Sequence, residues 1–460
     1  MNIQNTSAEK IQEIISKQRS FFRSEETLKF GFRKKMLKLL LKSMKRWEKE
    51  LSEALYKDLH KSYEEAYLTE FSIVYGEIKN HLKNFRDWAN RERISTPLKM
   101  FPSRTYLVKE PLGNTLIISP WNYPIQLLLN PLVGAISAGC TAILKPSPYV
   151  PNVSMVVGKM IAETFDENYI AVVQGNRDVN ATLLSFRYDL IFFTGSPSLG
   201  KLVMKAASQF LTPVILELGG KSPCIVDKNA DVKIAARRIV FGKTLNSGQT
   251  CIAPDYLFVH KKVKNDFVRA FQSELEKMHG KDVEKSQHYV RIVNVRAFDR
   301  VTSYLDEGDV IVGGGNNPET LFIEPTLIEN VAFDSPLMTE EIFGPIFPLH
   351  EFEDIDDVIQ FVNERDKPLA LYYFGEEKKG WKLIRRTSSG GACINDTIMH
   401  IANENVPFGG VGNSGMGSYH GKESFLAFSH RRAVVSTPRS FDLPLRYMPY
   451  KYFKWIKKIL

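Results

Sequence analysis

The sequence predicts an α/β fold with two regions of mainly parallel sheet. Short, uniformly apolar runs alternate with helix-compatible stretches from about residue 115 to about residue 411 of the 460-residue chain. Strands that are buried on both faces have this character, and their alternation with helices is typical of parallel sheets. The residues before this region have helical periodicity instead, which fits a helical segment leading into a sheet domain.

The N-terminal segment is predicted to be helical up to about residue 92. Thr6 and Glu9 have the spacing of a capping box, and the helix that follows would bury Ile11, Ile14 and Ile15. Helical periods continue over 24–58 and 63–92, and the first of these has an apolar face made of Met36, Leu39, Leu40 and Met44. Three prolines then interrupt the helical pattern around Tyr106-Leu-Val108, where the residues alone are compatible with a surface loop.

Five apolar runs predict the strands of the first sheet: 115–118, 141–144, 170–173, 189–193 and 213–216. Ligands of such sheets bind beyond the carboxyl ends of the strands. Asn122, Lys145, Ser196 and Glu217 all lie at or just after such ends, so the sequence predicts a binding site at this edge.

A second sheet is predicted within 220–411, from the apolar runs 224–226, 256–259, 310–312 and 326–328. Gly313-Gly-Gly315 is expected to form a turn, because it lacks the spacing of a phosphate-binding loop.

Composition excludes several classes of protein. Cysteines 140, 224, 251 and 393 have no C-x-x-C spacing, so no metal site is predicted. The N-terminus lacks the apolar core of a signal peptide, and no apolar run approaches the ~18–20 residues that span a bilayer. We therefore expect a cytoplasmic protein with reduced thiols. Residues 431–460 carry +7 of the net charge of +9, which argues against a nucleic-acid-binding body.

One stretch, Thr244-Leu-Asn-Ser-Gly-Gln-Thr-Cys251-Ile-Ala-Pro-Asp255, places a cysteine among small and polar residues. Such neighbours leave a sulfur accessible, as a nucleophile requires. A free cysteine is more commonly a buried structural residue, however, and this stretch alone leaves both readings open.

Motifs in other parts of the chain bear on this choice. Seven segments, spread over about residues 70–430, resemble motifs of the NAD(P)-dependent aldehyde dehydrogenases in both their sequence and their order along the chain. They are Pro120-Trp-Asn122-Tyr-Pro124, Leu144-Lys145-Pro-Ser147, Phe193-Thr-Gly-Ser196, Leu216-Glu217-Leu-Gly-Gly-Lys221, Gly248-Gln-Thr-Cys251, Glu340-Glu341-Ile-Phe343-Gly-Pro345 and Pro407-Phe408-Gly-Gly. The variants at 249–256 and 412–421 are most similar to the class 3 branch, which contains the fatty aldehyde dehydrogenases. The resemblance implies oxidation of medium- or long-chain aliphatic or aromatic aldehydes to carboxylic acids.

This resemblance also implies roles for three residues. Cys251 would attack the aldehyde carbon, and the Asn122 side chain with the Cys251 backbone N–H would stabilise the alkoxide. Glu217, which follows an apolar run, would activate the water that opens the thioester. Without the resemblance, Asn122 could simply hold a turn and Glu217 could be a salt-bridged residue at a strand end.

Coenzyme contacts are implied in the same way. Phe193-Thr194-Gly195-Ser196 to Gly200 follows a strand and opens a helix, but its spacing is not G-x-G-x-x-G, so alone it is a weak signal. By resemblance, Lys145 would bind the adenosine ribose, Glu341 would bind the nicotinamide ribose and Phe343 would pack beside it. The full predicted set is Trp121, Lys145, Ser147, Thr194, Gly195, Ser196, Gly200, Leu218, Glu341 and Phe343.

One position departs from many family members, which carry a glutamate directly after Lys-Pro-Ser. Here that residue is Pro148. A carboxylate there would bind the ribose hydroxyls and repel a 2′-phosphate, so its absence predicts that both NAD and NADP are accepted.

The predicted organisation has four parts. Residues 1–94 and 112–219 would form a Rossmann-like dinucleotide-binding domain and 220–411 a catalytic domain. The resemblance implies that 95–111, with a protruding strand around Tyr106-Leu-Val108, and 412–440 form a small β oligomerisation element of a homodimer. The basic, aromatic tail 441–460 would either touch an anionic membrane surface or pack on the dimer.

Three alternatives to this function remain. In a CoA-acylating dehydrogenase CoA would open the thioester and Glu217 would be redundant. A cofactor-free cysteine hydrolase would usually need a histidine partner, and none lies in the matched catalytic segments. A non-catalytic protein that kept the fold is disfavoured by the presence of Cys251, Glu217 and Asn122 together.

Overall fold

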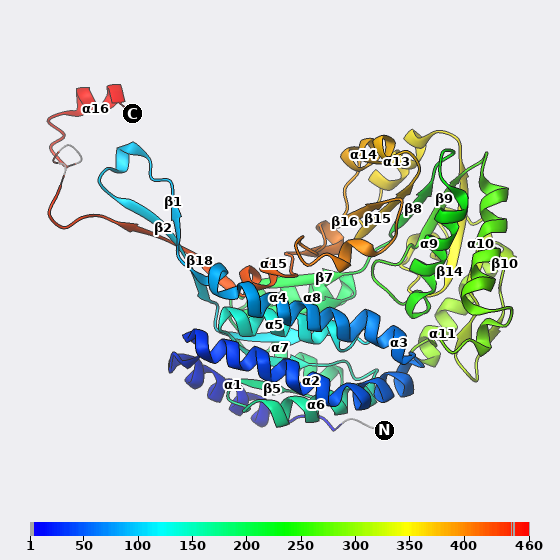
Figure 1. Ribbon diagram of the computed structural model, residues 1–460, viewed down its shortest axis with the longest axis horizontal. Helices are drawn as coiled ribbons and strands as arrows, with labels where there is room; N and C mark the ends of the chain where they lie inside the picture. Colours follow the sequence, from blue (N-terminus) through cyan, green and yellow to red (C-terminus); the bar gives the residue numbers. More distant parts are fainter. Residues whose placement is uncertain (1–3, 443, 445–446, 460) are drawn as a thin grey trace.

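The computed structural model describes residues 4–442, 444 and 447–459 (Figure 1). Leu443, Leu445, Arg446 and Leu460 of the predicted tail lie outside the described residues. Figure 1 shows two sheet-based bodies side by side and an arm that projects from the first of them.

Within the described residues, six strands form the first sheet, in the order β17-β7-β6-β3-β4-β5. All pairs are parallel except that of β17 with β7. The strands are β3 Asn114–Ile118, β4 Thr141–Lys145, β5 Ile170–Val172, β6 Leu190–Gly195, β7 Val214–Leu218 and β17 Gly415–Met416. The five predicted apolar runs are thus confirmed as strands, and β17 joins them from far along the chain.

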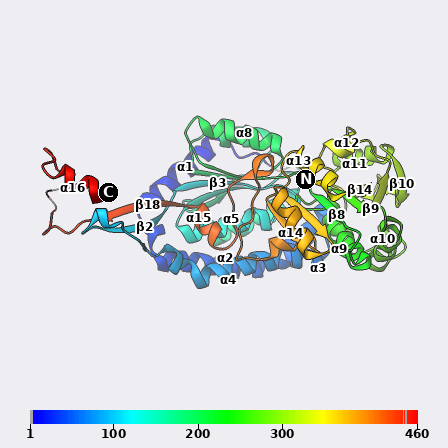
Figure 2. The same ribbon diagram turned by 90° about the horizontal axis from the view of Figure 1, so that it is seen from above.

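Helices cover both faces of this sheet, because successive side chains of each strand point to opposite sides. Leu116 and Ile118 pack with α1, α7 and α8, whereas Ile117 packs with α2, α4, α5 and α6. Figure 2 shows α8 on one side of the sheet and α2 with α4 on the other. The bounds of these helices and of the short α3 are α1 Ala8–Arg23, α2 Phe30–Leu59, α3 Tyr63–Ala66, α4 Ser72–Ala89, α5 Gln126–Ala138, α6 Pro151–Thr164, α7 Arg177–Leu184 and α8 Pro197–Ser208.

The predicted cap of α1 is wrong by one residue. Ser7 is the N-cap, and its side chain accepts a hydrogen bond from the Lys10 N–H. Thr6 instead accepts a hydrogen bond from the Gln174 N–H at 3.1 Å, which ties the segment before α1 to the loop after β5. The predicted apolar face is confirmed, since Ile11, Ile14 and Ile15 are all buried.

In the described part of the chain, seven strands form the second sheet, in the order β10-β13-β14-β9-β8-β15-β16. Its pairs are parallel except that of β10 with β13. The strands are β8 Pro223–Val226, β9 Tyr256–His260, β10 Asp309–Val312, β13 Thr326–Glu329, β14 Ile346–Phe352, β15 Ala370–Phe374 and β16 Gly391–Ile394. The four predicted strands are confirmed, and β14, β15 and β16 complete the sheet.

The helices of this second body are α9 Val232–Thr244, α10 Lys264–His279, α11 Val295–Thr302, α12 Pro336–Thr339, α13 Ile355–Asn363 and α14 Glu377–Arg386. A small hairpin joins β11 Asn316–Asn317 to β12 Phe322–Ile323. Gly313 and Gly314 have φ values of +74° and +99°, which fits the predicted turn.

The arm contains three strands among the described residues: β1 Glu92–Ile94, β2 Arg104–Pro111 and β18 Ser429–Ser436. β2 lies between the other two and pairs with β18 along its whole length. Residues 106–108 are therefore a strand and not a surface loop. Helix α15 Lys422–Ala427 leads into β18, and α16 Phe453–Ile459 lies near the C-terminus beside the arm (Figure 1).

The predicted α/β class with parallel sheets is confirmed by this architecture. In the part of the chain that the structure describes, no helix is both long enough and apolar enough to cross a membrane.

Candidate active site

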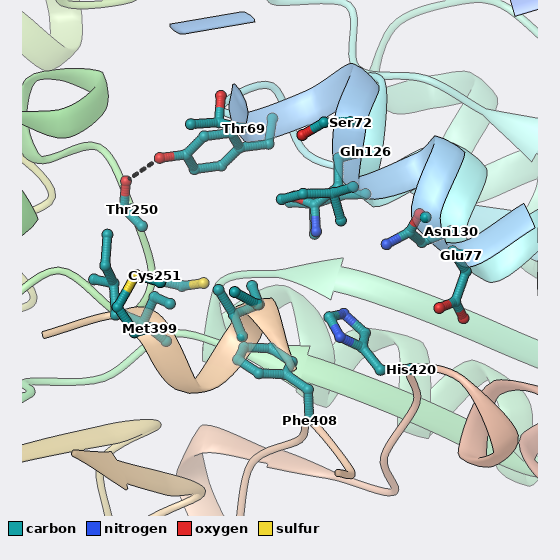
Figure 3. A pocket seen from close by; sticks show the side chains of 18 of the residues that line it. Thr69, Ser72, Glu77, Gln126, Asn130, Thr250, Cys251, Met399, Phe408 and His420 are labelled. Carbon is teal, nitrogen blue, oxygen red and sulfur yellow. Dashed lines mark hydrogen bonds between the residues drawn. The ribbon is translucent and has the colours of Figure 1, made fainter. Parts of the chain in front are cut away.

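A cavity of about 440 Å³ is lined by residues of both sheet-based bodies, including Cys251, Glu217 and Thr194 (Figure 3). Thr194 is on β6 and Glu217 on β7, near the carboxyl ends of these strands. Cys251 precedes β9 of the other sheet. The cavity thus lies at the sheet edge where the sequence predicted a binding site.

The turn before Cys251 has an unusual backbone. Asn246, Ser247 and Gly248 have successive φ values of +52°, +55° and +72°. Asparagine and glycine tolerate this left-handed region better than other residues. A Cβ on Gly248 would lie 2.3 Å from the carbonyl oxygen of Gly344, so glycine also allows the segment around Glu341 to approach the cysteine turn.

The Cys251 thiol is partly buried, and burial raises its pKa well above the ordinary value. The charges of Glu341 and Glu217 raise this pKa further, whereas the backbone N–H groups of Cys251 and Ile252 lower it. The raised pKa favours the protonated thiol, and the two N–H groups are placed to stabilise negative charge close to the sulfur.

Glu217 is buried at 3% exposure, and neither of its carboxylate oxygens has a hydrogen-bond partner among the described residues. Its cross-strand neighbours are Thr194 on one side and Gly415 on the other. Because glycine has no side chain, the carboxyl group has room on that side. Burial raises the pKa of Glu217 well above the ordinary value, as expected for a carboxyl group removed from water.

Asn122 lies after β3 and is buried. Its side-chain Nδ2 donates to the Gln249 carbonyl oxygen at 2.9 Å, which places it against the segment that carries Cys251. The Asn246 Nδ2 donates to the same carbonyl at 3.0 Å. An amide nitrogen has two protons, and this contact uses one of those on Asn122.

A buried polar network supports this arrangement from the N-terminal helices. Lys61 forms a fully buried ion pair with Glu70 at 2.9 Å and also donates to the Asn122 carbonyl oxygen. Glu70 accepts hydrogen bonds from the Ile125 and Gln126 N–H groups at the start of α5. These contacts fix the loop after β3 relative to α5.

Glu65 extends this network to the cysteine turn, because it accepts a hydrogen bond from the Asn246 N–H at 2.9 Å. Burial raises the pKa of Glu65 to about 7. The buried polar residues Lys61, Glu65, Glu70 and Asn246 were not singled out from the sequence. They have ordinary helix and turn spacing, and only their burial distinguishes them.

The predicted coenzyme residues form two groups. Trp121 and Phe343 are in edge-to-face contact with their ring centroids 5.4 Å apart. Glu341 lies beside Gly219, Gly220 and Lys221 in a second hollow of about 600 Å³, and burial raises its pKa to about 8. A Cβ on Gly219 would lie 2.1 Å from a Glu341 carboxylate oxygen, so a larger residue there would displace the Glu341 side chain from its present position.

The second group lies along the first sheet. Lys145 ends β4 and is buried, and its Nζ donates to the Pro146 carbonyl oxygen at 2.9 Å. Burial lowers the pKa of Lys145 to about 8. The Ser147 hydroxyl accepts from the Tyr149 N–H, and the Thr194 hydroxyl has no partner within the described residues.

Helix α8 begins in the same region, with Ser196 as its N-cap. Gly200 in its first turn packs against Leu218 of β7, and a Cβ there would lie 2.8 Å from a Leu218 methyl carbon. The start of α8 close to a strand end, the buried Lys145 ammonium and a Thr194 hydroxyl without a partner in the described structure fit the phosphate and ribose groups of a dinucleotide. No group of three or more His, Cys, Asp or Glu side chains suited to a metal ion occurs in the described ranges.

Comparison with known proteins identifies the family of the chain. The profile described as "Aldehyde dehydrogenase family" matches residues 1–434. The chain is 46% identical over 443 residues to the 4,4'-diaponeurosporen-aldehyde dehydrogenase of Staphylococcus aureus (strain NCTC 8325 / PS 47), covering 95% of this chain and 96% of that protein. It is 42% identical over 443 residues to the "Aldehyde dehydrogenase, dimeric NADP-preferring" of Canis lupus familiaris, covering 96% of this chain and 98% of that protein.

Among solved structures, the substrate-bound state of Staphylococcus aureus AldH matches with a TM-score of 0.96 and 45% identity, covering 98% of this chain and 99% of that one. The family inferred from the motifs is thereby confirmed, and with it the enzyme class, an oxidoreductase acting on aldehydes. The chain belongs to the aldehyde dehydrogenase family.

Proposed function

We propose that this protein oxidises aldehydes to carboxylic acids through a thioester on Cys251, with NAD or NADP as the oxidant. One observation carries the proposal: the Cys251 thiol, from the turn before β9, and the Glu217 carboxyl group, on β7, face one cavity. Neither oxygen of this carboxyl group has a hydrogen-bond partner among the described residues.

The chemistry begins at the Cys251 sulfur. Loss of the thiol proton to solvent gives a thiolate, which attacks the aldehyde carbon and forms a tetrahedral alkoxide. The second N–H of Asn122 and the Cys251 backbone N–H donate to that alkoxide. A bound oxidised nicotinamide supplies the hydride acceptor, so that the carbon leaves this stage as a Cys251 thioester.

Water must then open the thioester. Glu217 is the base for this step, because its buried carboxylate has a raised pKa and free acceptor sites toward the cavity, as counted over the described residues. It takes one proton from the attacking water, and collapse of the tetrahedral species returns the sulfur and releases the carboxylic acid.

Two groups of residues would hold the coenzyme. The adenosine and phosphate portion would be held by Lys145, Ser147, Thr194, Gly195, Ser196, Gly200 and Leu218. The nicotinamide ribose portion would be held by Trp121, Glu341 and Phe343. Support comes from the buried ammonium of Lys145 and the N-terminus of α8. The use of both coenzymes follows from Pro148, and a 42% identical relative is named as NADP-preferring.

The substrate is proposed to be a medium- or long-chain aliphatic or aromatic aldehyde. Apolar side chains such as Leu127, Leu245, Ile401 and Phe408 line much of the cavity that contains Cys251. Such a surface binds hydrocarbon. A relative with 46% identity is named for the aldehyde 4,4'-diaponeurosporen-aldehyde.

The test is to incubate the purified protein with an aldehyde panel and each coenzyme, and to measure reduced coenzyme and free acid together. We expect equal amounts of both, without CoA. An acyl-CoA product that requires added CoA would support the acylating alternative. Ester hydrolysis without any coenzyme reduction would support the hydrolase alternative.

We further propose that the chain acts as a homodimer, with 95–111 and 412–440 as its oligomerisation element. The dinucleotide-binding domain would then comprise 1–94 and 112–219, and the catalytic domain 220–411. The projecting arm, whose outer strands β1 and β18 have only β2 as a neighbour in the described structure, supports this role. Light scattering of the intact protein should give twice 52.5 kDa.

The tail is proposed to touch anionic membranes. Exposed Tyr450, Tyr452, Phe453 and Trp455 alternate there with lysines, a composition suited to a lipid surface. Deletion of 444–460 should abolish binding to vesicles containing phosphatidylserine. Unchanged binding would contradict this, and a loss of the dimer in its place would support packing of the tail on a second copy.

A further inference from the structure

The end of the cavity away from Cys251 holds a group of buried polar side chains. Figure 3 shows Asn130, Glu77 and His420 on that side, opposite Cys251 and Met399. Gln126 and Asn130 are four residues apart on α5, so they share one face of the helix. Between these polar groups and the cysteine, the lining is largely apolar.

These polar side chains are buried but their polar atoms are unused. Asn130 is 1% exposed, and both its Oδ1 and its Nδ2 have no hydrogen-bond partner in the described portion of the chain. By the same count over the described residues, Gln126 Nε2 and His420 Nε2 also have no partner. Buried polar atoms are normally paired, so a cluster of this kind, facing a cavity, indicates a ligand with complementary polar atoms.

The unused atoms include both donors and acceptors. Asn130 offers one of each and Gln126 Nε2 offers a donor. Burial lowers the pKa of His420, so its ring is neutral at neutral pH. A neutral imidazole has one donor and one acceptor nitrogen, so His420 Nε2 can take either role toward a ligand. A hydroxyl group, which both donates and accepts, matches this set.

A charged group matches less well. Glu77 lines the same end of the cavity, and its carboxylate accepts from His81, Gly421 and Ser424. Burial alone would raise the pKa of Glu77, but chiefly the hydrogen bond and charge of His81 lower it to about 2, so the carboxylate is negative. A substrate that ended in a carboxylate would be repelled by this charge.

We propose that the preferred substrates are aldehydes with an uncharged hydroxyl group at the end remote from the aldehyde carbon, and that Gln126, Asn130 and His420 bind this hydroxyl. The proposal rests on the aldehyde oxidation proposed above and specifies its substrate class. Hydroxyl binding adds to the apolar contacts along the hydrocarbon chain of the substrate. It also sets the chain length that fits, because the aldehyde carbon must reach Cys251 while the hydroxyl reaches the polar group at the other end of the cavity.

The test compares kcat/KM for straight-chain aldehydes with that for the matching ω-hydroxyaldehydes, over a series of chain lengths. In an apolar pocket the hydroxyl would lower kcat/KM at every length. We expect instead that over a narrow range of lengths the hydroxyaldehyde is favoured by at least about 10-fold, since a site built for a hydroxyl discriminates against the analogue that lacks it. The corresponding aldehyde with an ω-carboxylate should be a poorer substrate than the hydroxyaldehyde.

Asn130→Leu tests the assigned residue. The substitution keeps the approximate shape of the side chain and removes no hydrogen bond among the described residues, so the Tm should not fall. The ratio of hydroxyaldehyde to alkyl aldehyde kcat/KM should fall at least about 10-fold, as expected on loss of a buried hydrogen bond. Asn180→Leu, on α7 and away from the cavity, is the matched control and should leave this ratio unchanged.

Two outcomes would overturn the proposal. One is a preference for the alkyl aldehyde at every length. The other is an equal effect of Asn130→Leu on both substrate types, which would mean that the amides only hold water. Failure of the proposed function looks different, because neither aldehyde would then reduce the coenzyme.

Discussion

Glu217, on β7 of the six-stranded sheet, and Cys251, in the turn before β9 of the seven-stranded sheet, face the same cavity. Burial raises the pKa of both groups, and the Glu217 charge raises the pKa of Cys251 further. A thiolate and a carboxylate in this cavity therefore disfavour one another. In the proposed mechanism this conflict is avoided, because the Cys251 sulfur would react first and the Glu217 carboxylate would act only after the sulfur has become part of the uncharged thioester.

Cys251→Ala should abolish aldehyde-dependent coenzyme reduction, with a loss of at least about 10³-fold in kcat because the covalent step has no substitute. Mass spectrometry should detect a trapped acyl adduct on Cys251 in the wild-type protein and none in the variant. Cys393→Ala, at the other partly exposed cysteine, is the control and should retain activity. A Cys251→Ala protein with the wild-type rate would exclude the proposed mechanism.

Glu217→Gln should slow thioester hydrolysis, with kcat reduced by about 10²–10⁴-fold as is typical on loss of a general base. The first equivalent of reduced coenzyme should still form rapidly, and the free acid should then be released slowly in the steady state. Since only the deprotonated carboxylate is a base and burial raises its pKa, the wild-type kcat should rise with pH as Glu217 ionises. The variant should lose this rise; an unchanged pH profile would assign the base role elsewhere.

Asn122→Ala should lower kcat by about 10²–10³-fold through loss of an alkoxide donor. The cysteine turn should survive, because the Gln249 carbonyl still accepts from Asn246 Nδ2 at 3.0 Å. The Tm should be measured together with the kinetics. A Tm close to that of the wild type would show that the loss of activity comes from the missing alkoxide donor and not from a destabilised fold. If activity and Tm fall together, Asn122 holds the fold and does not serve the reaction.

Pro148→Glu should impair use of NADP selectively. A carboxylate next to the Lys-Pro-Ser segment would repel the 2′-phosphate, and we expect kcat/KM for NADP to fall at least about 10-fold while that for NAD is maintained or improved. Pro148→Ala controls for loss of the proline ring. Equal effects on the two coenzymes would show that position 148 does not face the adenosine ribose.

Glu65→Gln should change the pH dependence of stability. The folded pKa of Glu65 is raised from 4.5 to about 7, so between these values the folded state binds more protons than the unfolded state. The stabilisation from this proton is complete below pH 4.5 and is lost as the pH rises through about 7. Glutamine keeps an acceptor for the Asn246 N–H and does not titrate.

The difference in Tm between Glu65→Gln and the wild type should therefore increase in favour of the variant from pH 5 to pH 9. The neighbouring Glu64 is exposed, and Glu64→Gln serves as the matched control with no such trend. A pH-independent difference for Glu65→Gln would mean that this carboxyl group has an ordinary pKa.

Much of the fold was predictable because buried parallel strands are locally apolar. The runs at 115–118 and 141–144, for example, became β3 and β4 with nearly the predicted bounds. Strand β14 escaped prediction because Pro348 and His350 interrupt its apolar pattern. The Thr6 cap failed since Ser7 is equally suited, and the choice depended on a contact with Gln174 that lies far along the chain.

By itself, the sequence determined the family and the candidates for the reactive side chains, because both depend on short contiguous motifs such as those around Cys251 and Glu217. Only the tertiary structure decided that these two residues share a cavity, that Glu65 and Lys61 support its loops, and that Asn130 and His420 close its far end. The physical reason is that periodicity determines which face of one helix or strand is apolar, whereas burial of a polar atom without a partner results from how separate elements pack together.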